Sequence, residues 1–343
     1  MEVLRDALEQ GAFGDTLPGE RKLCELLRVS RPTLRAALAK LSQEGRIETV
    51  QGKPSRVLWR RQVQAPNAYR KLLVLTPLRA SEMPSFFRLT LDDLRLKIES
   101  LEMRLETLVE PVIASARPRL ALERLVAPQP DAIWLLYLSS EETQRWFYER
   151  NIPCVLAGTP VEGVPLPGVD HDYRAVCRHA ASTLINAGRR RLALLLPEGG
   201  RGGDEESKAG YLEGVSVRAG AAEPPRVVRH DTTVAGVVRV LERLLLQKAR
   251  IDGLLVGRSN HALTALTYLL RTGFKVPGDV ALIARDDDQF LAETTPAVAR
   301  YVTNPRQFAG ALLHTVARLA EGATLRSRLR LLVPSLVRGE TID

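Results

Sequence analysis

The chain has 343 residues, of which 45% are hydrophobic and 26% are charged, and its formal net charge is +9. This length and composition predict two or three globular domains, and no apolar run approaches the roughly 20 residues that a membrane-spanning helix needs. The three cysteines are too few and too widely spaced for a disulfide framework or a zinc site, so we expect a cytoplasmic protein with reduced thiols and no membrane partner.

Two short amphipathic helices are predicted before residue 28, because apolar residues recur there at helical spacing. The residues that they are expected to bury are Val3, Leu4, Ala7 and Leu8 in the first helix and Leu23, Leu26 and Leu27 in the second. Each helix is too short to be stable alone, so we expect both to share one small core with a third helix.

The third helix is expected to begin at about residue 31. Ser30 occupies the N-cap position, and Pro32 lies in the first turn, where a missing backbone N–H removes no hydrogen bond. Arg31 and Arg35 share an exposed stripe near the start of the helix, where base-contacting side chains usually lie. The opposite, apolar stripe consists of Leu34, Leu38 and Leu41.

After Gly45 the pattern changes from helical to extended. Residues 47–50 and 55–58 flank residues 51–54, which predicts a hairpin with Gly52 at its tip. Glycine allows a close approach to the sugar-phosphate backbone, and Lys53 and Arg56 supply positive charge. The sequence therefore predicts a winged helix-turn-helix that binds double-stranded DNA.

Across residues 2–58 this pattern resembles the GntR family of bacterial regulators. The resemblance implies operator contacts by Arg21, Arg31, Thr33, Arg35 and Gly52. With the cap and the other polar residues of the wing, the expected DNA-binding residues are Arg21, Ser30, Arg31, Thr33, Arg35, Gln51, Gly52, Lys53 and Arg56. The alternative is a winged helix that makes protein contacts, with its arginines only solvated.

The remainder of the chain predicts an α/β fold. Residues 61–70 are polar and contain Pro66, so we expect a linker between a DNA-binding domain in residues 1–60 and a second unit in residues 71–343. Short apolar runs then alternate with amphipathic stretches, which indicates βαβ units around parallel sheets. Strands are expected at residues 72–76, 132–138, 154–157, 192–196, 253–256 and 280–284.

Residues 71–340 resemble the effector domain of the LacI/GalR family. The resemblance rests on residues 170–172, which open a helix, on residues 273–287 and on the closing residues 334–340. It implies a periplasmic-binding-protein-like module of two α/β lobes, a small molecule in the cleft between them, and dimerisation through the lobes. A GntR-type head on a LacI-type body is similar in architecture to the bacterial arabinose repressor.

The expected pocket departs from that family. Three residues before Gly210, where the family commonly has an arginine that binds sugar hydroxyls, this chain has Ser207. It has Arg258 in place of the asparagine that follows residues 253–256, and Thr232 in place of an aromatic residue. Only Asp286 agrees with the family pattern. Because a guanidinium pairs with carboxylate or phosphate, Arg258 favours a sugar acid, a phosphosugar or another acidic metabolite over a neutral sugar. Alternatively, Arg258 faces solvent or pairs with Asp286, and the cleft has lost ligand binding and serves for dimerisation.

Phe86 and Phe87 follow the first expected strand, where the cleft-lining loop of the family begins. They either stack on a ligand or join the helix core with Leu89, Leu91 and Leu94. The expected ligand-binding residues are Phe86, Phe87, Ser207, Thr232, Arg258 and Asp286.

No cofactor, metal or catalytic motif is evident. The glycine-rich residues 198–204 lack the patterns of a phosphate loop or a dinucleotide turn, and we expect a mobile loop at the cleft rim. The histidines show no metal-binding or nucleophile spacing, so an enzyme is not expected.

Taken together, these patterns predict a ligand-responsive transcriptional regulator. We expect a repressor of carbohydrate or related metabolic genes, whose homodimer presents two winged heads to an approximately palindromic operator. The rival hypotheses are a small-molecule-binding protein with a vestigial head and a GntR head fused to an aminotransferase.

Overall fold

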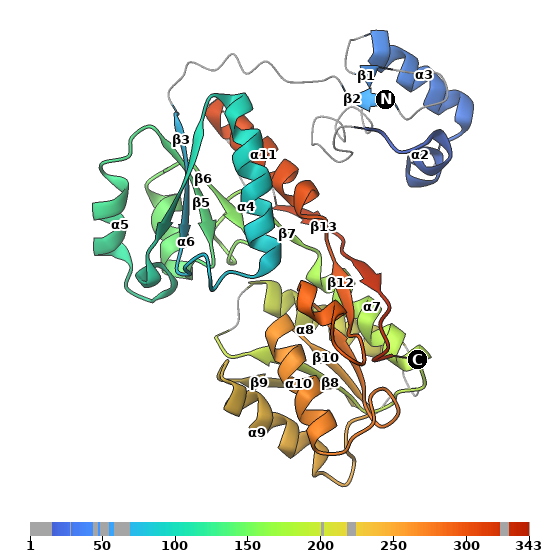
Figure 1. Cartoon of the computed structure of the whole chain (residues 1–343). Helices are drawn as coiled ribbons and strands as arrows, with labels where there is room; N and C mark the ends of the chain where they lie inside the picture. Colours follow the sequence, from blue (N-terminus) through green and yellow to red (C-terminus); the bar gives the residue numbers. More distant parts are fainter. Residues whose placement is uncertain are drawn as a thin grey trace.

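The computed structural model describes residues 16–27, 29–43, 47–48, 55–57, 69–199, 202–217, 224–322 and 329–342. The opening helix expected around residues 3–8, the wing residues Gln51, Gly52 and Lys53, and residues 61–68 of the expected linker lie outside this range. Figure 1 shows the N-terminal helices and two α/β lobes.

The N-terminal region contains helices α2 (Glu20–Leu27) and α3 (Arg31–Gln43) and strands β1 (Ile47–Glu48) and β2 (Arg56–Val57). The two strands pair antiparallel, which confirms the base of the expected hairpin. The core of this region consists of Leu17, Leu23, Leu34, Ala37, Leu38, Leu41 and Ile47. The prediction for Leu26 is wrong: it is 58% exposed, because the buried side of α2 runs through Leu23 and turns toward Cys24.

The first lobe has a parallel six-stranded sheet in the order β13-β7-β6-β5-β3-β4. Its strands are β3 (Lys71–Thr76), β4 (Arg104–Val109), β5 (Ala132–Tyr137), β6 (Cys154–Ala157), β7 (Gly168–His171) and β13 (Leu329–Leu332). Helices α4 (Ser85–Ile98) and α11 (Pro305–Ala320) share one apolar core with the sheet, and α5 (Arg119–Val126) and α6 (Glu141–Glu149) share the other. Short helices η1 (Glu99–Leu101) and η2 (Pro111–Ala114) complete this lobe.

The second lobe repeats this plan with the order β14-β12-β11-β10-β8-β9. Its strands are β8 (Leu192–Pro197), β9 (Arg226–His230), β10 (Gly253–Val256), β11 (Ala281–Ala284), β12 (Ala299–Val302) and β14 (Ser335–Val337). Helices α7 (Tyr173–Asn186) and α8 (Gly202–Ser216) contribute to one core, and α9 (Val234–Leu245) and α10 (Ser259–Arg271) to the other. A short helix η3 (Gln289–Ala292) follows β11.

The chain passes between the lobes at three places, after β7, after β12 and after β13. The first and third crossings touch, because the backbone N–H of Asp172 donates to the carbonyl oxygen of Leu332 at 2.8 Å. The six predicted strands are confirmed, and all but one pairing in the two large sheets are parallel. The exception is β14, which pairs antiparallel with β12 at a sheet edge.

In the described part of the chain, every helix is too short or too polar to cross a membrane.

Candidate functional site

The start of α3 has the geometry that the sequence predicts. The backbone N–H of Thr33 donates to Ser30 Oγ at 3.4 Å, and the hydroxyls of Ser30 and Thr33 are 2.8 Å apart. Because this cap fixes the first turn, Arg31, Thr33 and Arg35 lie exposed on the side of α3 away from its buried leucines. This end of the helix therefore presents two cations and a hydroxyl to solvent.

Arg35 is oriented by the preceding helix. Its Nε lies 3.1 Å and 3.0 Å from the two carboxylate oxygens of Glu20, and its guanidinium also forms a 3.0 Å ion pair through Nη2. The hydrogen bond from Arg35 lowers the pKa of Glu20. Arg21 and Arg56 are exposed as well, on α2 and β2 respectively.

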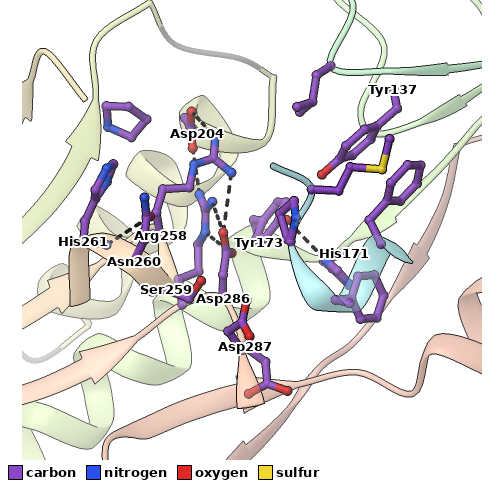
Figure 2. Close-up of a pocket in the computed structure, with 18 of the residues that line it drawn as sticks. Tyr137, His171, Tyr173, Asp204, Arg258, Ser259, Asn260, His261, Asp286 and Asp287 are labelled. Carbon is purple, nitrogen blue, oxygen red and sulfur yellow. Dashed lines mark hydrogen bonds and ion pairs between the residues drawn. The ribbon is translucent and has the colours of Figure 1, made fainter. Parts of the chain in front are cut away.

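A cavity of about 500 Å³ lies between the two lobes, as Figure 2 shows in close-up. Aromatic and apolar residues of the first lobe face polar residues of the second across it. The expected ligand-binding residues that line it are Phe86, Phe87, Thr232, Arg258 and Asp286. Such a volume is typical of small-molecule sites.

Four charged side chains on the second lobe form a closed ring of ion pairs, which we call the Arg–Asp ring. Arg258 lies 3.3 Å from Asp204 and 3.5 Å from Asp286. Arg285 lies 2.8 Å from Asp204 and 2.9 Å from Asp286. The two arginines and two aspartates balance each other in charge.

The ring removes the basis for the expected preference of Arg258 for an acidic ligand. That expectation required an available guanidinium, but Arg258 already has two carboxylate partners. The alternative prediction, that Arg258 pairs with Asp286, agrees with the observed ion pair. An anion that binds Arg258 must compete with Asp204 and Asp286.

Arg285 occupies the most buried position of the ring. Its side chain is 1% exposed, and its guanidinium lies 4.1 Å from the centre of the Tyr173 ring. Burial by itself would lower the pKa of Arg285, but the carboxylates of Asp286 and Asp204 raise it well above its usual value. Arg285 is therefore a fixed cation that orients both carboxylates.

The glycine-rich residues 198–204 were predicted to form a loop, but Gly202 and Gly203 form the first turn of α8. A Cβ atom on Gly203 would lie 2.8 Å from the Tyr173 ring, so only glycine lets α8 begin this close to the cavity. This approach carries Asp204, two per cent exposed, to the Arg–Asp ring.

Ser207 lies behind the cavity wall, one turn further along α8. It is fully buried, its hydroxyl donates to the Gly203 carbonyl at 2.7 Å, and it accepts from Arg285 Nη1 at 2.7 Å. Ser207 therefore supports Arg285 and is not among the lining residues. Thr232 lines the cavity with a left-handed backbone, φ 65°, and its N–H donates to His230 Nδ1 at 3.1 Å.

The first lobe supplies aromatic rings. Phe87 is 2% exposed and stacks on Tyr137 with ring centroids 3.6 Å apart. Phe86 contacts the rings of His171 and Phe308. Leu91 and Leu94 are buried as expected, but Leu89 is 53% exposed and does not join the core.

Several cavity residues are not among the site residues predicted from the sequence. Asp170 is buried, accepts a 2.7 Å hydrogen bond from Thr159 and a 2.8 Å bond from the backbone of His171, and has its pKa raised by burial to about 6. Burial lowers the pKa of His171 to about 4. The other cavity residues that were not predicted include Asp204, His261 and Arg285. Of these, only Arg285 stands in a sequence pattern that marks a charged site, because it directly precedes three aspartates.

The two parts of the chain match two known families. Residues 1–57 match the model for bacterial regulatory proteins of the gntR family, and residues 181–342 match the periplasmic binding protein-like domain. The HTH-type transcriptional regulator CelR of Thermobifida fusca is 27% identical over 207 residues, which cover 58% of this chain and 60% of CelR. The chain thus spans little more than half the length of the curated relatives that it matches.

Solved structures extend the likeness in fold. The transcriptional regulator CelR in complex with cellobiose has a TM-score of 0.68 and 19% identity, covering 94% of this chain and 99% of that one. A putative LacI transcriptional regulator from Bacillus cereus subsp. cytotoxis has a TM-score of 0.70 and 16% identity, covering 80% and 99%. The chain therefore matches the gntR model at its N-terminus and the periplasmic binding protein-like model over residues 181–342, and its two lobes have the fold of these solved structures.

Proposed function

We propose that this chain is a ligand-responsive transcriptional regulator. In this proposal residues 1–60 bind operator DNA, residues 61–70 form a linker, and residues 71–343 bind the effector and form a homodimer. The observation that carries it is the capped, exposed start of α3 with Arg31, Thr33 and Arg35. In DNA-bound helix-turn-helix proteins this end of the second helix lies in the major groove.

The roles of the basic residues follow from their positions. Arg31 lies in the first turn of α3, and we propose that it contacts a base edge. Arg35 is proposed to enter the same groove, and its ion pair with Glu20 supports a defined orientation. We propose phosphate contacts by the exposed Arg21 and Arg56, and also by Gln51, Gly52 and Lys53, which lie outside the described residues. Ser30 holds the helix start in register.

Fluorescence anisotropy with DNA from upstream of this protein's own gene tests this part. Arg31→Ala is expected to weaken specific binding by about 1 to 3 kcal/mol if the arginine contacts a guanine with two hydrogen bonds. The matched control is Arg95→Ala, which removes the same charge from the exposed face of α4. An equal loss on operator and random DNA, or an equal loss in the control, contradicts base contact by Arg31.

The cavity is the proposed effector site, and a sugar is the proposed effector. CelR, which is similar in sequence and fold, has been solved in complex with cellobiose. Among sugars, sugar acids and phosphosugars, the self-paired Arg258 disfavours the two acidic classes. In this proposal, effector binding alters the closure of the two lobes and thereby the affinity for the operator. The size of the change is set by how much more tightly the effector binds one closure state of the lobes than the other. We propose repression of carbohydrate genes as the biological outcome.

A second candidate is a regulator whose cleft no longer binds an effector and serves for dimerisation. The observation that favours it is the complete pairing within the Arg–Asp ring. Titration calorimetry with neutral, acidic and basic sugars separates the two, because a cleft without effector binding gives no heat and no change in operator affinity with any of them.

A further inference from the structure

The cavity wall carries more negative charge than the Arg–Asp ring balances. Among the described residues that line it, seven are acidic and two are arginines, and the ring uses both arginines. Asp287 is paired outside the ring with Arg300 at 2.7 Å. The carboxylates that remain are those of Glu82, Asp170, Glu198 and Asp288.

Three of these four carboxylates, those of Glu82, Asp170 and Asp288, accept hydrogen bonds from neutral groups in the part of the chain that the structure describes. Asp288 accepts from Ser85 Oγ at 2.9 Å, Glu82 from the backbone N–H of Arg79 at 2.9 Å, and Asp170 from Thr159 and a backbone N–H. No described lysine or arginine lies within 4 Å of any of the four. Among the described residues, therefore, none of the four forms an ion pair, although Arg285 acts on Asp170 from a longer distance and lowers its pKa.

The histidines of the wall do not offset this charge. Burial lowers the pKa of both His171 and His261, so both rings are neutral at pH 7. Repulsion from the uncompensated carboxylates therefore opposes the entry of an acidic ligand, and a cationic ligand is attracted by them.

His261 gives an independent indication of a ligand that donates hydrogen bonds. It is 6% exposed, lines the cavity, and its Nδ1 has no hydrogen-bond partner in the described structure. The ring also makes a hydrogen bond to the backbone of Thr232. In a neutral ring with one nitrogen donating, the other nitrogen is an acceptor. A buried acceptor without a partner favours a ligand N–H or O–H.

We propose that the effector is a sugar that carries an ammonium group, an amino sugar. The carboxylates that lack a cation hold the ammonium group, the Arg–Asp ring exchanges hydrogen bonds with hydroxyls, and Phe86 and Tyr137 contact the apolar face of the sugar. A purely apolar cation offers no hydrogen-bonding groups to Asn260 and His261. An amino sugar offers hydroxyls to these polar residues and an ammonium group to the carboxylates. This inference rests on the proposed function and names the chemistry of the same site.

Titration calorimetry of the full chain with four β-1,4-linked probes tests the proposal. The probes are the β-1,4-linked glucosamine dimer, its diacetyl form, cellobiose and cellobionate. The glucosamine dimer is expected to bind at least about tenfold more tightly than cellobiose at pH 7, with an advantage that declines as salt is raised. Cellobionate is expected to bind weakest of the four.

Asp170→Asn supplies the matched variant, because it removes the charge while the amide oxygen accepts from the backbone N–H of His171 and the amide NH2 donates to the Thr159 hydroxyl, which reverses that bond. It is expected to reduce the preference for the amine over cellobiose several-fold. Asp92→Asn, on the exposed face of α4, is the control and is expected to change neither.

The outcomes separate the two proposals. Tighter binding of cellobiose or cellobionate than of the amine overturns the amino-sugar inference and leaves an effector-responsive regulator. Failure of all four probes overturns the inference together with the sugar effector, while operator binding, measured separately, still decides whether the chain recognises DNA. A preference for the amine that Asp170→Asn does not reduce overturns the role of this carboxylate.

Discussion

Substituting Arg285 by methionine removes the cation that connects both carboxylates of the Arg–Asp ring. In the native protein its Nη1 lies 2.8 Å from Asp204 and its Nε 2.9 Å from Asp286, and the side chains of Arg285 and Asp204 are 1% and 3% exposed. Breaking a buried ion pair by removing one partner costs about 3 to 5 kcal/mol, since the other charge stays buried. Arg258 still contacts both carboxylates, so we expect the lower end, about 3 kcal/mol.

Differential scanning calorimetry of the full chain measures this loss. A loss of this size corresponds to a fall of roughly 6 to 12 °C in the Tm of the effector unit. Adding Asp204→Asn to Arg285→Met is expected to recover more than about 1 kcal/mol, because it removes the stranded charge. The control Arg95→Met breaks an exposed pair with Asp92 and is expected to cost less than about 1 kcal/mol. An Arg285→Met protein as stable as the control, or a double variant less stable than the single one, refutes this account.

Three further predictions concern the head, the cleft and pH. Ser30→Ala removes the cap of α3 and is expected to destabilise the head by about 1 kcal/mol. The loss is measured as a lower temperature at which the helical circular dichroism disappears, and Ser30→Thr is the conservative control. Ser85→Ala removes the hydrogen bond that joins α4 to Asp288 on the second lobe, so we expect a several-fold weaker effector affinity by calorimetry, and an unchanged affinity contradicts it. Burial raises the pKa of Asp170 from 3.8 to about 6, so the folded state binds an extra proton between these values and the free energy of unfolding falls as pH rises through them. Asp170→Asn is expected to remove this decline in urea titrations at pH 4 to 7, and a parallel decline in both proteins argues against it.

Local patterns predicted what depends on neighbours in the chain. The N-cap at Ser30, the leucine stripe of α3 and the six apolar strands are properties of short windows, and all of them are present in the structure. The strands that were missed are mostly edge or polar strands, such as β4, whose side chains are largely exposed and therefore give no apolar run. The wrong prediction for Leu26 has a related cause, because helical spacing alone leaves the centre of the buried face uncertain by one position.

The charge of the cavity could not be predicted in this way, because it depends on residues that meet only after folding. Arg258 follows β10, Asp204 lies in the first turn of α8, and Arg285 follows β11, so the ion pairs of the ring join positions up to 81 residues apart. Considered alone, Arg258 favours an acidic ligand, but its two partners reverse that inference. A substituted residue in a binding site is therefore a guide to the ligand only when its charge partners are known. Here those partners remove the preference for an acid, and the carboxylates outside the ring favour a base, a difference that one titration series decides.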